Sequence, residues 1–434
     1  MAPGRPDSGE CRHRLSNLSK HLVRGPGFPM NLISVLLIIV GAMSREQCFD
    51  TYRSAVKSAT RETWLKKSLW KGQCMGIKTR ILAGLLMVLA MAVLVACDLE
   101  IGGGDEEEAR GSTLDEIIDR GNLVCGIKAD TPGFGVLNPD GTAVGNDVEY
   151  CRALAAAVFG NANQVEYIEA TSANRFELLA AKEIDVLIRT TTWTASRDAD
   201  LEVAYAPTTF YDGAGIMVKA EAGLSSVNEL GGATICILDG TSTQGAVSDY
   251  FAEQGLSYEE LTFQANPELR AAFISDQCDA WSSDKSQLGG HQFTLTADGV
   301  NAVVLPETLS KEPLGPSVRD YDSEWEDVVR WVVNGMIIAE EQGVTSQNVR
   351  QMAAAPPNNT VARLLGVGFD GGAAPNLGIG HGKIPITFMQ SVIEQVGNYG
   401  EAYARTLERV GLTRSGSLND SYVNGGLIYS PPMR

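Results

Sequence analysis

The chain of 434 residues has few basic residues for its length. It holds 35 Lys and Arg against 53 Asp and Glu, which gives a net charge of −18 and an isoelectric point near 4.7. Binding of a nucleic-acid backbone depends on Lys and Arg that neutralise its phosphates. We therefore expect no nucleic-acid partner.

Histidines and the common catalytic motifs are also scarce. After residue 112 the chain has only His291 and His381, and no Cys-x-x-Cys pair that would suggest a zinc site. It has no Gly-x-Ser-x-Gly nucleophile elbow, no His-Glu-x-x-His and no evident acid/base pair. We expect no metal, no cofactor and no enzymatic activity.

Charge is distributed unevenly along the chain. Residues 1–97 carry 14 Lys and Arg against 5 Asp and Glu, whereas the rest carries 21 against 48. The apolar share of 44% is ordinary for a globular protein and too low for one with many membrane spans. The N-terminal quarter therefore differs in kind from the remainder.

This N-terminal quarter contains a segment typical of an export signal. Residues 75–80 are positively charged, and the 16 residues 81–96 carry no charge, which is short of the roughly 20 that a spanning helix needs. The run ends at Leu94-Val-Ala-Cys97 and resembles the lipobox of bacterial lipoproteins, in which the cysteine is acylated. We predict that 75–97 is a lipoprotein signal peptide and Cys97 the lipidation site. An uncleaved anchor helix is the alternative.

The segments on either side of this signal have separate interpretations. We interpret residues 1–74 as a leader that arises from a mis-called start, although they could be a genuine extension. Residues 98–112 are acidic, rich in glycine and without periodicity, so they predict a flexible tether.

The body alternates strand-like and helix-like segments. Strand-type runs cover 122–128, 164–168, 184–189, 233–238 and 278–282, and helical spacing of apolar residues covers 147–159, 172–181, 243–253, 324–342 and 385–396. This alternation predicts an α/β architecture with mainly parallel sheets. Two passages, 210–219 and 303–316, would cross between two lobes. We predict lobe 1 over 113–214, lobe 2 over 215–308, a return to lobe 1 over 309–355, and a C-terminal extension packed on lobe 1 over 356–434.

Four cysteines lie in the body: Cys125, Cys151, Cys236 and Cys278. An even number in an exported chain suggests disulfides. The sequence allows three pairings, of which 125–151 and 236–278 would follow if each lobe closes its own pair. Buried free thiols are the alternative.

Polar residues that could hold a small zwitterion follow several predicted strands, where α/β crevices bind ligands. After the strand at 184–189, Thr190 and Thr192 precede Arg197, whose planar fork suits a carboxylate. In lobe 2, Thr241 and Ser242 follow Gly240 at the start of a helix, an arrangement that accepts anions but also describes an ordinary N-cap.

Two further residues complete the candidate set. Asp284, just past the strand at 278–282, could bind an ammonium group or could cap a helix. Phe134, in the loop after the first strand, could stack on a ligand side chain or pack against its own lobe.

The body resembles the polar amino-acid-binding proteins of ABC importers, which are two-lobed periplasmic binding proteins, and among them the general L-amino-acid binders. The motifs that carry the resemblance are Arg175-Phe176, 184–198, Tyr211-Asp-Gly213, Gly240-Thr241, 278–284, 310–316 and 395–401. The resemblance implies that Arg197, Thr190, Thr192 and the turn at Thr241 and Ser242 bind the α-carboxylate. It also implies that Asp284 binds the α-ammonium group.

The function that follows is capture of an L-amino acid between two lobes and its delivery to the membrane subunits of an ABC permease. The protein would act outside the cytoplasm, attached to the membrane by its lipid. A ligand-sensing module and a dehydratase-like enzyme on the same fold remain alternatives.

Overall fold

The computed structural model describes residues 112–434. The predicted leader (1–74), the signal peptide (75–97) with Cys97, and all of the predicted tether except Ser112 lie outside the described residues. Within 112–434, no helix combines the length and the apolar character that crossing a bilayer requires.

Lobe 1 is built on a five-stranded sheet with the strand order β5-β1-β6-β15-β7. β1 pairs in parallel with β5 and β6, whereas β15, which returns from lobe 2, is antiparallel to β6 and β7. The strands are β1 (Leu123–Ile127), β5 (Val165–Glu169), β6 (Val186–Leu187), β7 (Val203–Tyr205) and β15 (Ser317–Arg319). A small antiparallel sheet lies beside them, formed by β2 (Asp130–Thr131), β3 (Gly135–Leu137) and β4 (Ala143–Val144).

Helices pack on this sheet because their apolar faces have the spacing that the sequence predicts. α6 spans Asn146–Phe159 and ends at Gly160, whose left-handed φ of 68° suits glycine. α12 spans Ser323–Glu341 and buries most of its apolar side chains. The other helices of this part are α5 (Thr113–Arg120), α7 (Arg175–Ala180) and α8 (Ala195–Asp200).

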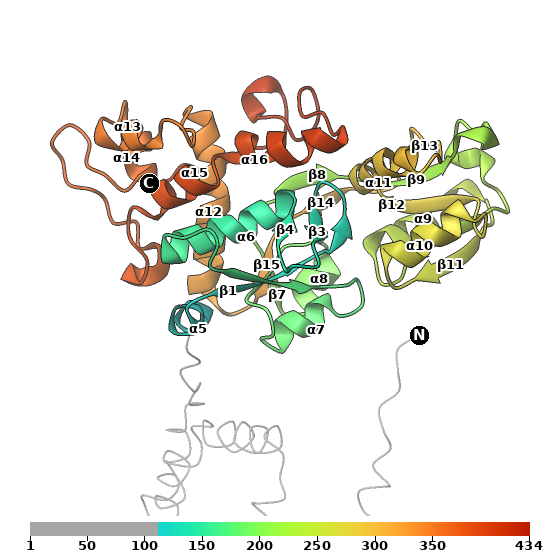
Figure 1. Cartoon of the computed structure of the whole chain (residues 1–434), viewed down its shortest axis with the longest axis horizontal. Helices are drawn as coiled ribbons and strands as arrows, with labels where there is room; N and C mark the ends of the chain where they lie inside the picture. Colours follow the sequence, from blue (N-terminus) through green and yellow to red (C-terminus); the bar gives the residue numbers. More distant parts are fainter. Residues whose placement is uncertain (1–111) are drawn as a thin grey trace, which may run out of the picture. The chain divides into compact units, whose positions relative to one another are not determined.

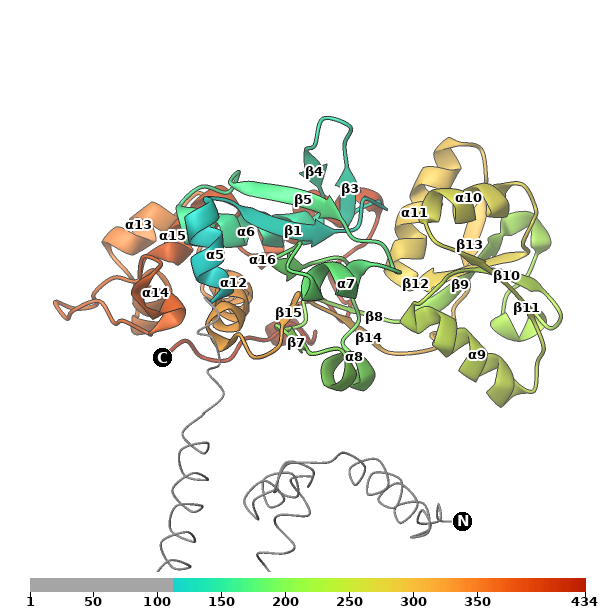
Figure 2. The ribbon, with the colours of Figure 1, turned by 90° about the horizontal axis from the view of Figure 1, so that it is seen from below.

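Lobe 2 contains a second five-stranded sheet, ordered β11-β10-β12-β9-β13. β10 pairs in parallel with β11 and β12, and β9 is antiparallel to β12 and β13. The strands are β9 (Ala214–Lys219), β10 (Thr234–Leu238), β11 (Glu259–Phe263), β12 (Ala280–Asp284) and β13 (Ala302–Val304). The helices are α9 (Ser242–Gln254), α10 (Asn266–Ile274) and α11 (Lys285–Ala297), with short 3-10 turns at Ala220–Ala222 and Val227–Glu229. Figures 1 and 2 show these elements gathered apart from the lobe 1 sheet.

Two antiparallel strands connect the lobes. β8 (Phe210–Asp212) leaves lobe 1 and β14 (Glu312–Leu314) returns to it, and the two pair directly, with Asp212 opposite Glu312. We call this pair the hinge. Domain closure around a ligand uses hinges of this kind, in which a few residues at the ends of elements absorb the change of backbone angles.

The chain after α12 forms four helices and three short 3-10 turns. They are α13 (Val349–Ala354), α14 (Asn359–Leu364), α15 (Phe388–Gln395) and α16 (Tyr399–Thr406), with turns at Ile379–Gly382, Glu408–Val410 and Tyr422–Asn424. Apolar residues of this region, such as Val392 and Leu407, share one core with Leu123 of β1. α15 lies along α6 (Figure 1).

This C-terminal region also contacts the hinge. The side chain of Asn419 accepts a hydrogen bond from the backbone N–H of Tyr211 (2.7 Å) and donates one to the carbonyl of the same residue (3.0 Å). The Tyr399 hydroxyl donates to the carbonyl of Thr209, just before β8 (2.9 Å). The region is therefore attached to a hinge strand as well as to lobe 1.

Two disulfides resolve the pairing that the sequence leaves open. Cys125 of β1 is bonded to Cys151 of α6, and Cys236 of β10 is bonded to Cys278, which precedes β12. Each lobe closes its own pair. In both lobes the disulfide holds a strand whose carboxyl end faces the site described next.

Candidate functional site

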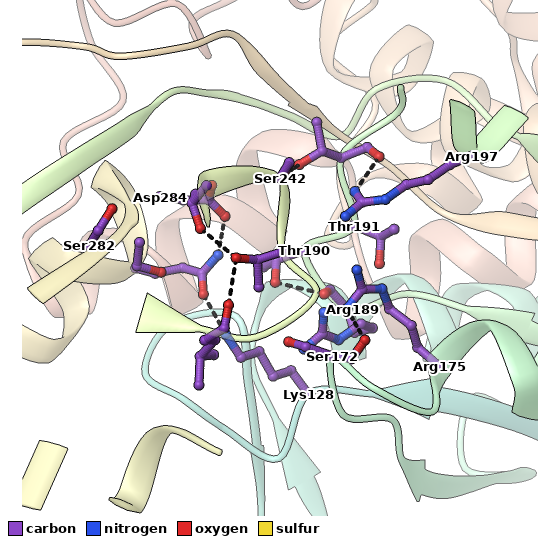
Figure 3. Close-up of a pocket in the computed structure, with 16 residues that line it drawn as sticks. Lys128, Ser172, Arg175, Arg189, Thr190, Thr191, Arg197, Ser242, Ser282 and Asp284 are labelled. Carbon is purple, nitrogen blue, oxygen red and sulfur yellow. Dashed lines mark hydrogen bonds between the residues drawn. The ribbon is translucent and has the colours of Figure 1, made fainter. Parts of the chain in front are cut away.

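A pocket lies between the two lobes, at the carboxyl ends of the parallel strands. Residues after β1, β5 and β6, with Arg175 of α7 and Arg197 of α8, supply its lobe 1 wall. The ends of β10 and β12 with the starts of α9 and α11 supply its lobe 2 wall. Its lining residues are Lys128, Ser172, Arg175, Arg189, Thr190, Thr191, Thr192, Arg197, Leu238, Thr241, Ser242, Thr243, Ser282, Ser283, Asp284 and Gln287. Figure 3 shows ten of these labelled.

Six of the seven side chains predicted to bind a ligand line this pocket: Thr190, Thr192, Arg197, Thr241, Ser242 and Asp284. Phe134 does not. It is fully buried in lobe 1 and packs edge-on against Phe210, with ring centroids 5.2 Å apart. The alternative interpretation of this residue, packing within its own lobe, matches the structure, and we correct its placement accordingly.

The loop after β6 has an unusual backbone. Thr190 has a left-handed φ of 51°, which is rare for a β-branched residue. Its N–H donates to Oδ2 of Asp147, the second residue of α6 (2.8 Å). Burial raises the pKa of Asp147 to about 7, although this hydrogen bond opposes the rise. The strained turn therefore points Thr190 and its neighbours at the pocket.

Arg197 stands at the outer part of the same wall. It lies on α8, whose N-cap Thr194 accepts a hydrogen bond from the Arg197 N–H. The guanidinium donates to the Thr192 carbonyl (2.8 Å) and lies 5.6 Å from the centre of the Phe176 ring. These contacts hold the side chain and leave donors of the planar fork free for a carboxylate.

The lobe 2 turn at Gly240 begins α9. Gly240 has a φ of 68°, and Thr241 is the N-cap, with its hydroxyl accepting from the N–H of Gln244 (3.2 Å). The unpaired backbone N–H groups at the start of a 13-residue helix attract anions. Thr241 therefore serves as a cap, and the helix start that it fixes faces the pocket.

Asp284 is the last residue of β12, which ends two residues later than the strand predicted at 278–282. It is 5% exposed, and its Oδ1 has no hydrogen-bonding partner among residues 112–434. Its other oxygen accepts from the Gln287 side chain. Burial, then the negative charges of Asp212 and Glu312, hold the pKa of Asp284 well above its ordinary value. A cation placed against Oδ1 would relieve both effects.

Four residues at the site have no role predicted from the sequence. Lys128, Arg175 and Arg189 line the pocket, and Glu312 of the hinge contacts two lining residues. Lys128 follows β1 and Arg189 follows β6 almost directly. The strand-end rule that identified Thr190 could therefore have identified both of them.

A two-lobed α/β protein with a polar, charged pocket between its lobes has the architecture of a solute-binding protein. The sequence model of the bacterial extracellular solute-binding proteins, family 3, matches residues 123–352. The chain belongs to this family, and the family gives it an extracytoplasmic location.

Known relatives agree with this membership. The glutamate/glutamine/aspartate/asparagine-binding protein BztA of Rhodobacter capsulatus is 38% identical over 329 residues, which cover 75% of this chain and 94% of BztA. The general L-amino acid-binding periplasmic protein AapJ of Rhizobium johnstonii is 37% identical over 347 residues, which cover 80% of this chain and 99% of AapJ. A periplasmic binding protein of an ABC transporter from Brucella ovis, solved with glutathione bound, matches with a TM-score of 0.70 and 38% identity. That match covers 75% of this chain and all of the other.

These findings confirm three predictions from the sequence: the resemblance to amino-acid-binding proteins of ABC importers, the two-lobed α/β fold, and a binding protein rather than an enzyme.

Proposed function

We propose that the protein captures an L-amino acid between its lobes and delivers it to the membrane subunits of an ABC permease. One observation carries the proposal: Arg197 of lobe 1 and Asp284 of lobe 2 line the same pocket. An amino acid needs an anion-binding and a cation-binding group together. Here each lobe supplies one of them, so the ligand stabilises the closed arrangement through contacts that an open one lacks.

In this proposal the α-carboxylate is bound by Arg197, by the loop at Thr190 and Thr192, and by the start of α9 with Thr241 and Ser242. Because the hydroxyls of Thr192 and Ser242 donate to Glu312, these two residues would offer the ligand their backbone N–H groups. The α-ammonium group is bound by Asp284, whose buried Oδ1 lacks a partner in the described part of the chain. The names of BztA and AapJ, both amino-acid binders, support this ligand class. We also propose that lobe 1 consists of residues 113–214 and 309–355, and lobe 2 of residues 215–308, as the sequence predicts.

Replacement of Arg197 tests the carboxylate contact. Arg197→Ala should weaken amino-acid binding by about 2–5 kcal/mol, the range for truncating one partner of a buried charge pair. Isothermal titration with the purified protein measures it. Arg409→Ala is the matched control because Arg409 is exposed and lies outside the pocket lining. Unchanged affinity in Arg197→Ala would contradict the assignment.

We further propose that Cys97 is acylated and that residues 98–112 tether the fold to the membrane. The uncharged run 81–96 ending in Leu-Val-Ala-Cys supports this. Mass spectrometry of the mature protein should find an N-terminal peptide that begins at an acylated Cys97. Glu106→Gln, within the predicted tether, should leave the acylation unchanged, whereas Cys97→Ser should abolish it. An unmodified Cys97 in the wild-type protein would refute the anchor.

A further inference from the structure

Three buried cations gather at one part of the pocket. Lys128, Arg175 and Arg189 are 6%, 2% and 5% exposed; Lys128 and Arg189 follow β1 and β6, and Arg175 is the first residue of α7. Figure 3 shows them together around Ser172, with Arg197 and Ser242 toward the opposite end of the view. A second pocket that shares Lys128, Ser172 and Arg189 extends the space on this side.

These cations are held by neutral groups. Lys128 donates to the side-chain oxygen of Gln287 (2.6 Å), and Arg175 donates to the carbonyls of Ser172 (2.7 Å) and Gly240 (3.0 Å). None of the three has a carboxylate oxygen within 4.0 Å in the described part of the chain. Buried charge without a charged partner is unfavourable.

Arg189 has the poorest set of partners. It makes one long hydrogen bond to the Ser172 hydroxyl (3.4 Å), and its Nε has no partner among residues 112–434. Two of the carboxylates whose charges act on Arg189 are hydrogen-bonded to other groups. Asp130 accepts from the side chain and the N–H of Asn266, and Asp147 accepts from Thr190.

The electrostatics of the three residues agree with this geometry. Burial, then the charge of Arg189, lowers the pKa of Lys128 to about 8 and that of Arg175 to about 8. The cations thus repel one another in a buried site, and the charges of Asp130, Asp147 and Asp284 offset this repulsion only in part, without an ion pair to any of the three cations among the described residues. A zwitterionic ligand would use Arg197 and Asp284 and would place no anion beside Arg189.

We propose that Arg189, flanked by Lys128 and Arg175, binds a second anionic group of the ligand, so that the site prefers amino acids whose side chain ends in a carboxylate. The proposal rests on the proposed function and names its substrate class. A side-chain carboxylate would accept hydrogen bonds from the free Nε donor of Arg189 and neutralise one of the three charges. A side-chain amide of the same shape would not supply that charge.

Glutamate and glutamine form the decisive ligand pair because they have the same shape and differ in charge. Titration calorimetry of the wild-type protein should show glutamate bound at least about tenfold more tightly than glutamine, a difference of about 1.4 kcal/mol. In Arg189→Gln this ratio should fall about tenfold or more. The control Arg409→Gln should keep the wild-type ratio.

Each outcome decides the proposal. Equal affinities for glutamate and glutamine in the wild type, or an unchanged ratio in Arg189→Gln, would overturn it while amino-acid binding stands. No binding of any amino acid would reject the proposed function and this inference with it. If thermal unfolding shows that Arg189→Gln is not folded, Lys128→Met takes its place, and it too should lower the ratio. An unchanged ratio in a folded Lys128→Met would then overturn the proposal.

Discussion

The hydroxyl oxygens of Thr192 and Ser242 lie 3.1 Å apart, although Thr192 belongs to lobe 1 and Ser242 to lobe 2. Both hydroxyls donate to the same oxygen, Oε2, of Glu312, and for Ser242 the distance is 2.7 Å. Glu312 is 2% exposed and lies on the hinge strand β14. One hinge carboxylate therefore joins the two walls of the pocket in this structure.

This contact predicts that Glu312 stabilises closure. Glu312→Ala removes the shared acceptor, so the closed state should be less populated and amino-acid affinity should fall about tenfold, given the usual strength of hydrogen bonds to a charged group. Titration calorimetry gives the affinity, and small-angle scattering without ligand should show a more extended particle. Glu253→Gln, at an exposed position on α9, is the control. Unaltered affinity and scattering in Glu312→Ala would show that the contact has no role in closure.

Asp147 should make stability depend on pH. Its pKa in the folded protein is raised to about 7 by burial, above its ordinary value of 3.8, so the folded state holds a proton that the unfolded state releases. The stability that the folded protein gains by keeping Asp147 neutral is therefore fully present below pH 4, and it is lost as the pH rises through 7. Asp147→Asn, which stays neutral and keeps an acceptor for Thr190, should lose less stability over this range. Melting temperatures from pH 4 to 8 measure the difference. Parallel curves for the two proteins would contradict the assignment.

Asn419 should stabilise the hinge from the C-terminal region. Its side chain satisfies both backbone groups of Tyr211, so Asn419→Ala leaves a donor and an acceptor without partners and should reduce the free energy of unfolding by about 1–3 kcal/mol. Urea denaturation measures it. Asn301→Ala, an exposed position in lobe 2, should change stability by less than about 0.5 kcal/mol. A loss no larger in Asn419→Ala than in Asn301→Ala would refute the role.

The disulfide of lobe 2 should stabilise the fold without determining ligand choice. Cys236 and Cys278 are 42 residues apart in sequence, and their bond restricts the unfolded chain. Replacing both by serine should reduce the free energy of unfolding by about 2–4 kcal/mol. The order of preference among amino acids should stay the same because neither sulfur lines the pocket. A changed order would show that the bond shapes the site.

The architecture could be predicted from the sequence where apolar periodicity is strong. The helix predicted at 147–159 is observed at Asn146–Phe159, and that at 324–342 at Ser323–Glu341. Local side-chain bonds shift other boundaries. The helix predicted from 172 begins at Arg175, because Thr171 and Asn174 exchange hydrogen bonds that hold the preceding turn.

The site was predictable only in part. Thr190 and Arg197 were found because they follow one strand in a single motif. The contacts of Glu312 depend on hinge pairing and closure, and that of Asn419 joins a side chain to a backbone 208 residues away. No sequence pattern indicates either contact, because the partners are far apart in the chain. Phe134 was misplaced because a loop position does not reveal whether an aromatic ring faces a ligand or its own core.

A thermal-shift panel of the purified protein tests the central claim most directly. The panel holds the twenty L-amino acids, some D-amino acids, glutathione and common sugars. A ligand that binds only the folded state at 100 times its Kd adds about 2.7 kcal/mol of stability. The account predicts a clear rise in melting temperature with L-amino acids and none with sugars. No shift with any L-amino acid would contradict it.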